Sequence, residues 1–99
     1  MTTINRDSIA VAIVEAARQE ANVSARDIDR IERVMEPPRW AFRRRRIRER
    51  VIDETLDSML AASVIVATPD GVQPAMDWST ILDFIRELLP IILQIISMF

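Results

Sequence analysis

The stretch that decides the fold is WSTILDFIRELLPIILQIISMF, residues 78–99 at the end of the chain. On a helix, at about 100° per residue, its polar positions gather in one narrow stripe. That stripe contains Asp83, Arg86, Glu87, Pro90, Gln94 and Ser97. The residues expected to dock on an apolar partner surround it: Trp78, Ile81, Leu82, Phe84, Ile85, Leu88, Leu89, Ile92, Leu93, Ile95, Ile96 and Phe99. An apolar surface this wide predicts a helix with a large apolar partner.

Three kinds of partner remain open: the rest of the domain or a second subunit, a membrane, or a groove on another protein. The segment would extend about 33 Å as a helix, close to the thickness of a bilayer core. However, charges at Asp83, Arg86 and Glu87 lie in its first half, and Pro90 lies on its polar stripe. These features argue against a lone spanning helix and favour a helix that lies on an apolar surface.

The composition favours an all-α chain without catalytic chemistry. The 99 residues include one Gly and no Cys, His or Tyr, and the sequence contains no Lys. Most nucleophiles, acid–base groups and soft metal ligands are therefore missing. We expect a protein that is not an enzyme, with no cofactor and no metal site.

Capping residues divide the chain into four expected helices. Asn5, Ser24 and Asp77 can each cap a helix start, and each lies between apolar residues that can form a hydrophobic staple. The expected helices run over about 6–21, 25–36, 39–62 and 77–99, the third beginning directly after Pro37-Pro38. Residues 61–68 fit either a helix end or an extended segment. The expected organisation is a helical domain over 1–68, a Pro-containing linker over 69–76 and a terminal amphipathic helix over 77–99.

The expected third helix changes its apolar face between Val51 and Ile52. Trp40, Ile47 and Val51 share one face, whereas the apolar residues from Ile52 onward share a different one. Two explanations remain open: the helix bends there, or its two halves pack against different partners.

The segment RWAFRRRRIRER, residues 39–50, carries a local charge of +6 in a chain of net charge −2. Its arginines are Arg39, Arg43, Arg44, Arg45, Arg46, Arg48 and Arg50. On a helix they point in every direction, which suits contact with a polyanion or with anionic lipid headgroups. The alternative is a solvated helix with local ion pairs. Trp40 and Phe42 could stack on bases, anchor at a lipid interface or pack internally.

These features predict a small structural or assembly subunit, such as a phage or virion component, that forms part of an oligomer or larger complex. In this hypothesis the terminal helix docks on a membrane or another subunit, and the arginine segment faces nucleic acid or another polyanion. The alternative is a nucleic-acid-binding regulator in which residues 39–50 bind and the terminal helix forms an oligomer interface. No secretory signal is recognised at the N-terminus, and the sequence does not indicate a localisation.

Overall fold

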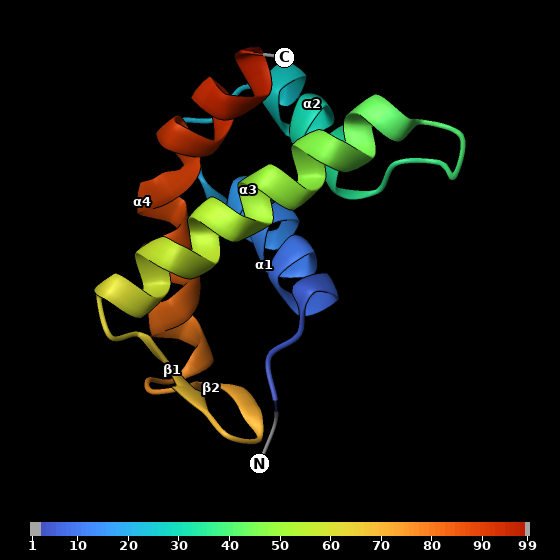
Figure 1. Ribbon diagram of the computed structural model, residues 1–99. Helices are drawn as coiled ribbons and strands as arrows, with labels where there is room; N and C mark the ends of the chain where they lie inside the picture. Colours follow the sequence, from blue (N-terminus) through green and yellow to red (C-terminus); the bar gives the residue numbers. More distant parts are fainter. Residues whose placement is uncertain (1–2, 99) are drawn as a thin grey trace.

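Four helices and one two-stranded hairpin make up the computed structural model, which describes residues 3–98 (Figure 1). The elements are α1 (Arg6–Gln19), α2 (Ala25–Met35), α3 (Phe42–Ala61), β1 (Ile65–Thr68), β2 (Gly71–Pro74) and α4 (Trp78–Ser97). They form one mostly helical body of about 35 × 31 × 20 Å. This architecture confirms the fold class that the sequence predicts, with a small hairpin added before the last helix.

Two helix starts have the predicted side-chain caps. The carboxamide oxygen of Asn5 accepts a hydrogen bond from the backbone N–H of Ser8 at 2.8 Å. The hydroxyl of Ser24 accepts one from the N–H of Asp27 at 3.1 Å. Each bond satisfies a backbone donor that has no partner within the first helical turn. The starts of α1 and α2 are therefore fixed by the local sequence.

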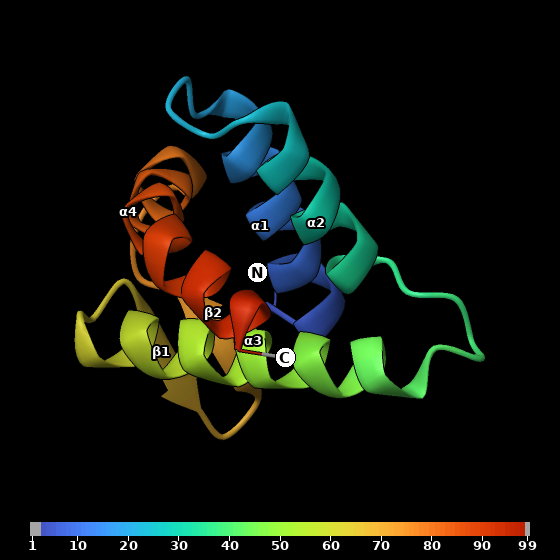
Figure 2. The same ribbon diagram turned by 90° about the horizontal axis from the view of Figure 1, so that it is seen from above.

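α3 begins three residues later than the sequence predicts. The N–H of Ala41 donates to the carbonyl of Pro38 at 3.0 Å, and that of Phe42 donates to the carbonyl of Trp40 at the same distance. These bonds form a tight turn, so Arg39 and Trp40 lie in a loop and not in the helix. The loop and the first turn of α3 project from the body of the molecule (Figures 1 and 2).

The end of α3 is a Schellman motif. The N–H of Val64 donates to the carbonyl of Met59 at 3.0 Å, and the N–H of Ser63 donates to that of Leu60 at 3.1 Å. Ser63 has a φ of 60°, in the left-handed region that the motif requires. The motif turns the chain directly into β1, so residues 61–68 end a helix and then become extended.

The segment expected to be a linker is instead a turn followed by β2. β1 and β2 pair antiparallel, with Ile65 opposite Pro74 and Thr68 opposite Gly71. Gly71 has a φ of 121°, which a side chain would strain. The N–H of Ile4 donates to the carbonyl of Val72 at 2.8 Å, so the residue before the cap of α1 also lies against the hairpin. Backbone hydrogen bonds therefore hold residues 71–75 of this segment against β1 and the end of α3.

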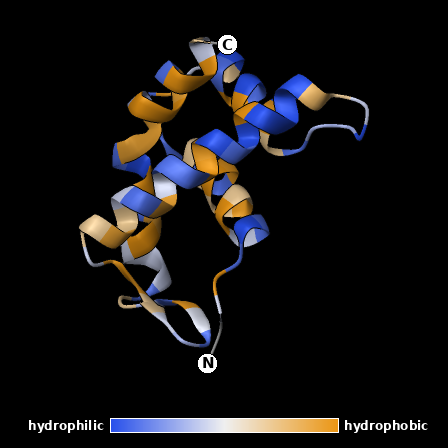
Figure 3. Ribbon diagram, in the orientation of Figure 1, coloured by the Kyte–Doolittle hydropathy of each residue, from blue (hydrophilic) through white to orange (hydrophobic). Residues whose placement is uncertain are grey.

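α1 lies at the centre of the helical body, and the other helices surround it (Figure 2). One side of α1 is fully buried and rich in small side chains, which allows the neighbouring helices to approach closely: Ile9, Ala12, Ile13, Ala16 and Ala17. Apolar and polar residues alternate along each helix (Figure 3), and the buried core draws apolar residues from all four helices. The hydrophobic effect therefore holds α4 against the rest of the same chain.

α3 is a continuous helix whose two halves pack against different elements. It starts beside α2, crosses α1 and ends past α4 (Figures 1 and 2). Ile47 and Val51 are buried in its first half, and Ile52 and Met59 in its second half. This packing explains the change of apolar face between Val51 and Ile52.

Candidate functional site: a basic and aromatic tip

The structure divides the seven arginines of residues 39–50 into two groups. Arg39, Arg43, Arg44 and Arg45 lie in the projecting loop and the first turn of α3, together with the exposed aromatic residues Trp40 and Phe42. We call residues 39–45 the tip. The others, Arg46, Arg48 and Arg50, lie further along α3.

The tip arginines have no carboxylate partner within 4.0 Å in the part of the chain that the structure describes. Arg45 donates one hydrogen bond, from Nη1 to the carbonyl of Arg39 at 3.2 Å. Arg39, Arg43 and Arg45 are exposed, whereas Arg44 is half-buried. Their positive charge is therefore available to an external anion.

Arg48 has a structural role and does not belong to the tip. Its side chain is only 17% exposed and donates to the carbonyl of Met35 at the end of α2, with the two atoms 3.0 Å apart. It also contacts the carboxylates of Asp7 at 2.8 Å and Glu49 at 3.0 Å. Each of its three nitrogen atoms donates a hydrogen bond to a group of the same chain, so this arginine is held within the fold.

Two large aromatic side chains accompany the tip arginines. Trp40 is 74% exposed and Phe42 is 72% exposed, so both rings lie mostly in solvent. Exposed aromatic rings of this size are costly in water unless a partner covers them. The sequence left open whether Trp40 and Phe42 meet a ligand or pack internally, and their exposure shows that neither ring is packed in the core.

The start of α3 has the reverse of the charge pattern that stabilises the starts of α1 and α2. The first turns of α1 and α2 contain Asp7 and Asp27, and both helices have a side-chain cap. The first turn of α3 contains no acidic residue, its N-cap Ala41 has no capping side chain, and arginines follow immediately. Cations at the positive end of a helix dipole are each unfavourable by about 0.3–1 kcal/mol. A bound anion would remove this repulsion and accept hydrogen bonds from the free backbone N–H groups.

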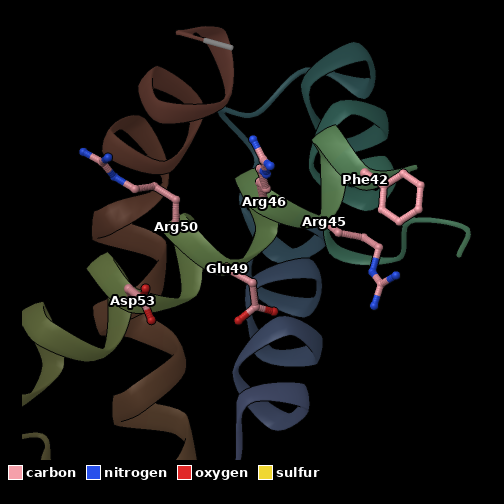
Figure 4. Close-up of a pocket in the computed structure, with 6 residues that line it drawn as sticks. All are labelled: Phe42, Arg45, Arg46, Glu49, Arg50 and Asp53. Carbon is pink, nitrogen blue, oxygen red and sulfur yellow. The ribbon is translucent and has the colours of Figure 1, made fainter. Parts of the chain in front are cut away.

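An open pocket continues from the tip along the outer surface of α3 (Figure 4). It is lined by Phe42, Arg45, Arg46, Glu49, Arg50 and Asp53. Arg6 reaches this surface from α1 and pairs with Glu49 and with Asp53, the latter at 2.8 Å. The arginines without a carboxylate partner among residues 3–98, Arg45 and Arg46, therefore lie at the tip end of the pocket, whereas the carboxylates of its far half are paired with Arg6.

Burial disfavours the charged form of Arg6, but its hydrogen bonds to Asp53 and Glu49 outweigh burial and raise the pKa of its guanidinium.

At the start of α4, hydroxyl donors from Thr80 and Ser79 lower the pKa of the exposed Asp77 carboxyl. Asp77 is the residue predicted to cap α4, and its side chain bonds to these hydroxyls without bonding to a backbone N–H. The cap position is thus confirmed, although its hydrogen-bond partners differ from those of Asn5 and Ser24.

The residues predicted to dock on an apolar partner lie mainly in the core of this chain. Buried side chains are Ile81, Leu82, Ile85, Leu89, Ile92 and Ile96. Phe84, Leu88, Leu93 and Ile95 are partly buried against the same core, and Trp78 is 39% exposed. Phe99 lies outside the described residues. Within residues 3–98, no helix has both the length and the apolar character needed to cross a membrane.

Comparisons with protein-family models, with curated proteins and with solved structures found no match for this chain. The chain is therefore described by its fold and surface alone. It is a small, mostly helical domain with a projecting basic and aromatic tip.

Proposed function

We propose that this chain is a non-enzymatic nucleic-acid-binding protein that holds single-stranded nucleic acid at its tip. The observation that carries the proposal is the combination of arginines without carboxylate partners and two exposed aromatic rings on one projecting segment. Single strands are bound by such sites because arginines contact phosphates while aromatic rings stack on bases.

The all-arginine composition supports a phosphate ligand. A guanidinium offers a planar set of N–H donors that matches two phosphate oxygens at once. The tip projects from the body, so a bound strand can approach it from solvent, although Glu36 and Glu49 lie near its base beside Arg39 and Arg45. A net charge of −2 for the whole chain does not prevent this binding, because the nearest charges dominate at physiological salt.

An anionic membrane is a less suitable ligand for the same segment. Insertion at a lipid interface gains free energy from a continuous apolar face. The tip offers Trp40 and Phe42, separated by Ala41, which is buried in the protein, and flanked by arginines. Isolated rings between cations suit base stacking better than insertion into a bilayer.

The assembly role predicted for the terminal helix stays a prediction. It requires an apolar face of α4, and the side chains at the centre of that face are buried in the domain. The exposed large apolar residues of α4 are Trp78 and Ile91, and the exposed Met98 follows directly after the helix. The tip needs no rearrangement to meet a ligand, and for that reason we place the function there.

The test is to measure binding of a fluorescently labelled oligothymidylate to the full chain by anisotropy. The proposal expects saturable binding that Trp40→Ala and Arg43→Ala each weaken about tenfold, or about 1.4 kcal/mol. For Trp40 this lies within the range of about 1–3 kcal/mol for one stacked base. Arg26→Ala is the matched control, because Arg26 is exposed on α2 and belongs to no ion pair of residues 3–98. Equal binding by wild type and both tip variants would contradict the proposal.

A second measurement uses vesicles that contain anionic lipid and asks whether the chain binds a membrane instead. Flotation of the chain with these vesicles, together with no binding of the oligonucleotide, would assign the tip to a lipid surface instead. Binding of the oligonucleotide without flotation would support the proposal.

A further inference from the structure

The outer face of α3 is not covered by any other element of the described chain (Figures 1 and 2). Among the exposed charged side chains of this face, Glu49 and Glu54 are paired with arginines of the same chain, and four others lie in one line: Arg46, Arg50, Asp53 and Asp57. Their spacing of four, three and four residues places them on one stripe of the helix. We call this set the α3 stripe.

The α3 stripe is basic in its first half and acidic in its second half. Arg46 and Asp57 both lack an ion-pair partner among residues 3–98. They are separated by 11 positions, or roughly 16 Å along the helix axis, so they cannot pair within one chain. Each residue therefore presents an unused charge to solvent, and the two charges are opposite.

We propose that two copies of this chain associate through antiparallel packing of their α3 stripes. An antiparallel copy reverses the order of the charges, so Arg46 of each copy faces Asp57 of the other. In the same register, Arg50 of each copy faces Asp53 of the other. A parallel pair would instead place arginine opposite arginine and aspartate opposite aspartate. Charge complementarity therefore selects both a second copy and its direction.

The association is expected to be weak, because the ion pairs between the two copies are exposed to solvent. Arg46–Asp57 would be a new contact, whereas Asp53 already holds Arg6 at 2.8 Å and Arg50 lies 4.0 Å from Glu54. Exposed ion pairs are individually weak and are screened by salt. We therefore expect a reversible dimer that weakens as the salt concentration rises.

The two tips lie at opposite ends of the dimer. In this register Phe42 and Arg43 of each copy lie opposite Ala61 and Leu60 of the other, so the first turn of α3 lies at the edge of the interface and the loop residues Arg39 and Trp40 lie beyond it. The inference rests on the charges of the α3 stripe and does not depend on the proposed function.

The test uses sedimentation equilibrium of the full chain without nucleic acid, at low and high salt. We expect wild type to form a dimer, and Arg46→Asp or Asp57→Arg alone to raise the dissociation constant at least tenfold. Each single change creates two like-charge contacts in the dimer. The double variant Arg46→Asp/Asp57→Arg is expected to associate like wild type, because both pairs are restored with exchanged signs.

An equimolar mixture of the two single variants gives an independent result. One chain then has Asp at 46 and 57 and the other has Arg at both, so the mixture is expected to form a heterodimer. Arg26→Asp is the matched control, an equal charge change on α2 away from the stripe, and circular dichroism checks that all variants fold. A wild-type chain that stays monomeric, or a dimer that no single reversal weakens, would overturn the proposal. So would failure of both the double variant and the mixture to restore association.

Discussion

Arg48 on α3 binds the carboxylate of Asp7 at the start of α1, with Nη2 and Oδ1 2.8 Å apart and 41 positions between the two residues. Nε of the same side chain donates to the carbonyl of Met35 at the end of α2, at 3.0 Å. One arginine thus joins three helices, and it shows that a basic segment can contain residues with entirely different roles.

Replacing Arg48 by Ala is expected to lower the free energy of unfolding by about 1–2 kcal/mol. The exposed carboxylate of Asp7 can turn to water, so most of the loss comes from the carbonyl of Met35. Urea unfolding measures the change. Arg43→Ala, an exposed arginine of the same helix, should stay within about 0.5 kcal/mol of wild type. If the two variants were equally stable, Arg48 would not be a structural residue.

Leu89→Ala is expected to destabilise the domain by about 2–5 kcal/mol, because the side chain is buried and its removal leaves a cavity. Ile91→Ala, two positions further along α4, is the matched control because Ile91 is 50% exposed. Thermal or urea unfolding of both variants provides the comparison. Similar stability for the two variants would indicate that α4 does not pack in this core. That is the result expected if α4 were a separate docking helix.

Ser63→Gly is expected to stabilise the protein by about 0.5–1 kcal/mol, because Gly adopts the left-handed backbone without the strain of a side chain. Ser63 has a φ of 60° at the end of α3. Ala61→Gly, inside the last turn of the helix, should lower stability by a similar amount. Changes of the same sign in both variants would mean that α3 does not end in the Schellman motif.

Acid should remove a part of the stability that Asp77 provides. Hydrogen bonds from Thr80 and Ser79 lower the pKa of Asp77 below its ordinary value of 3.8. A lowered pKa in the folded state stabilises the fold above the unfolded pKa, and this contribution is lost as the pH falls through the folded value. Asp77→Asn keeps an acceptor but does not titrate, so it should be less stable than wild type at neutral pH. The difference should shrink below pH 3.8. A difference independent of pH in urea unfolding would contradict this account.

Local rules predicted much of the fold. Asn5 and Ser24 cap their helices through bonds between neighbours in sequence, and such bonds can be read from residue types. The hairpin was harder to predict, because pairing of Ile65 with Pro74 depends on a turn and on the end of α3 together. The start of α3 was placed too early because the turn at Pro38 could not be distinguished from a first helical turn.

The partner of α4 could not be predicted from its sequence. Amphipathic spacing shows which face is apolar, and it does not show what covers that face. Ile85 and Leu89 are buried against the same chain, a result of tertiary packing that periodicity does not contain. The same limit applied to Arg48, because its partners Asp7 and Met35 are brought together only by the fold.

The salt dependence of binding tests the central claim, that the tip is a nucleic-acid site, most directly. With phosphate contacts from Arg39, Arg43, Arg44 and Arg45, the logarithm of the binding constant for a single strand should fall with the logarithm of salt at a slope of about −3. Arg43→Ala should make this slope shallower by about 0.7, and Arg26→Ala should leave it unchanged. A slope near zero, or one that Arg43→Ala does not change, would contradict the account.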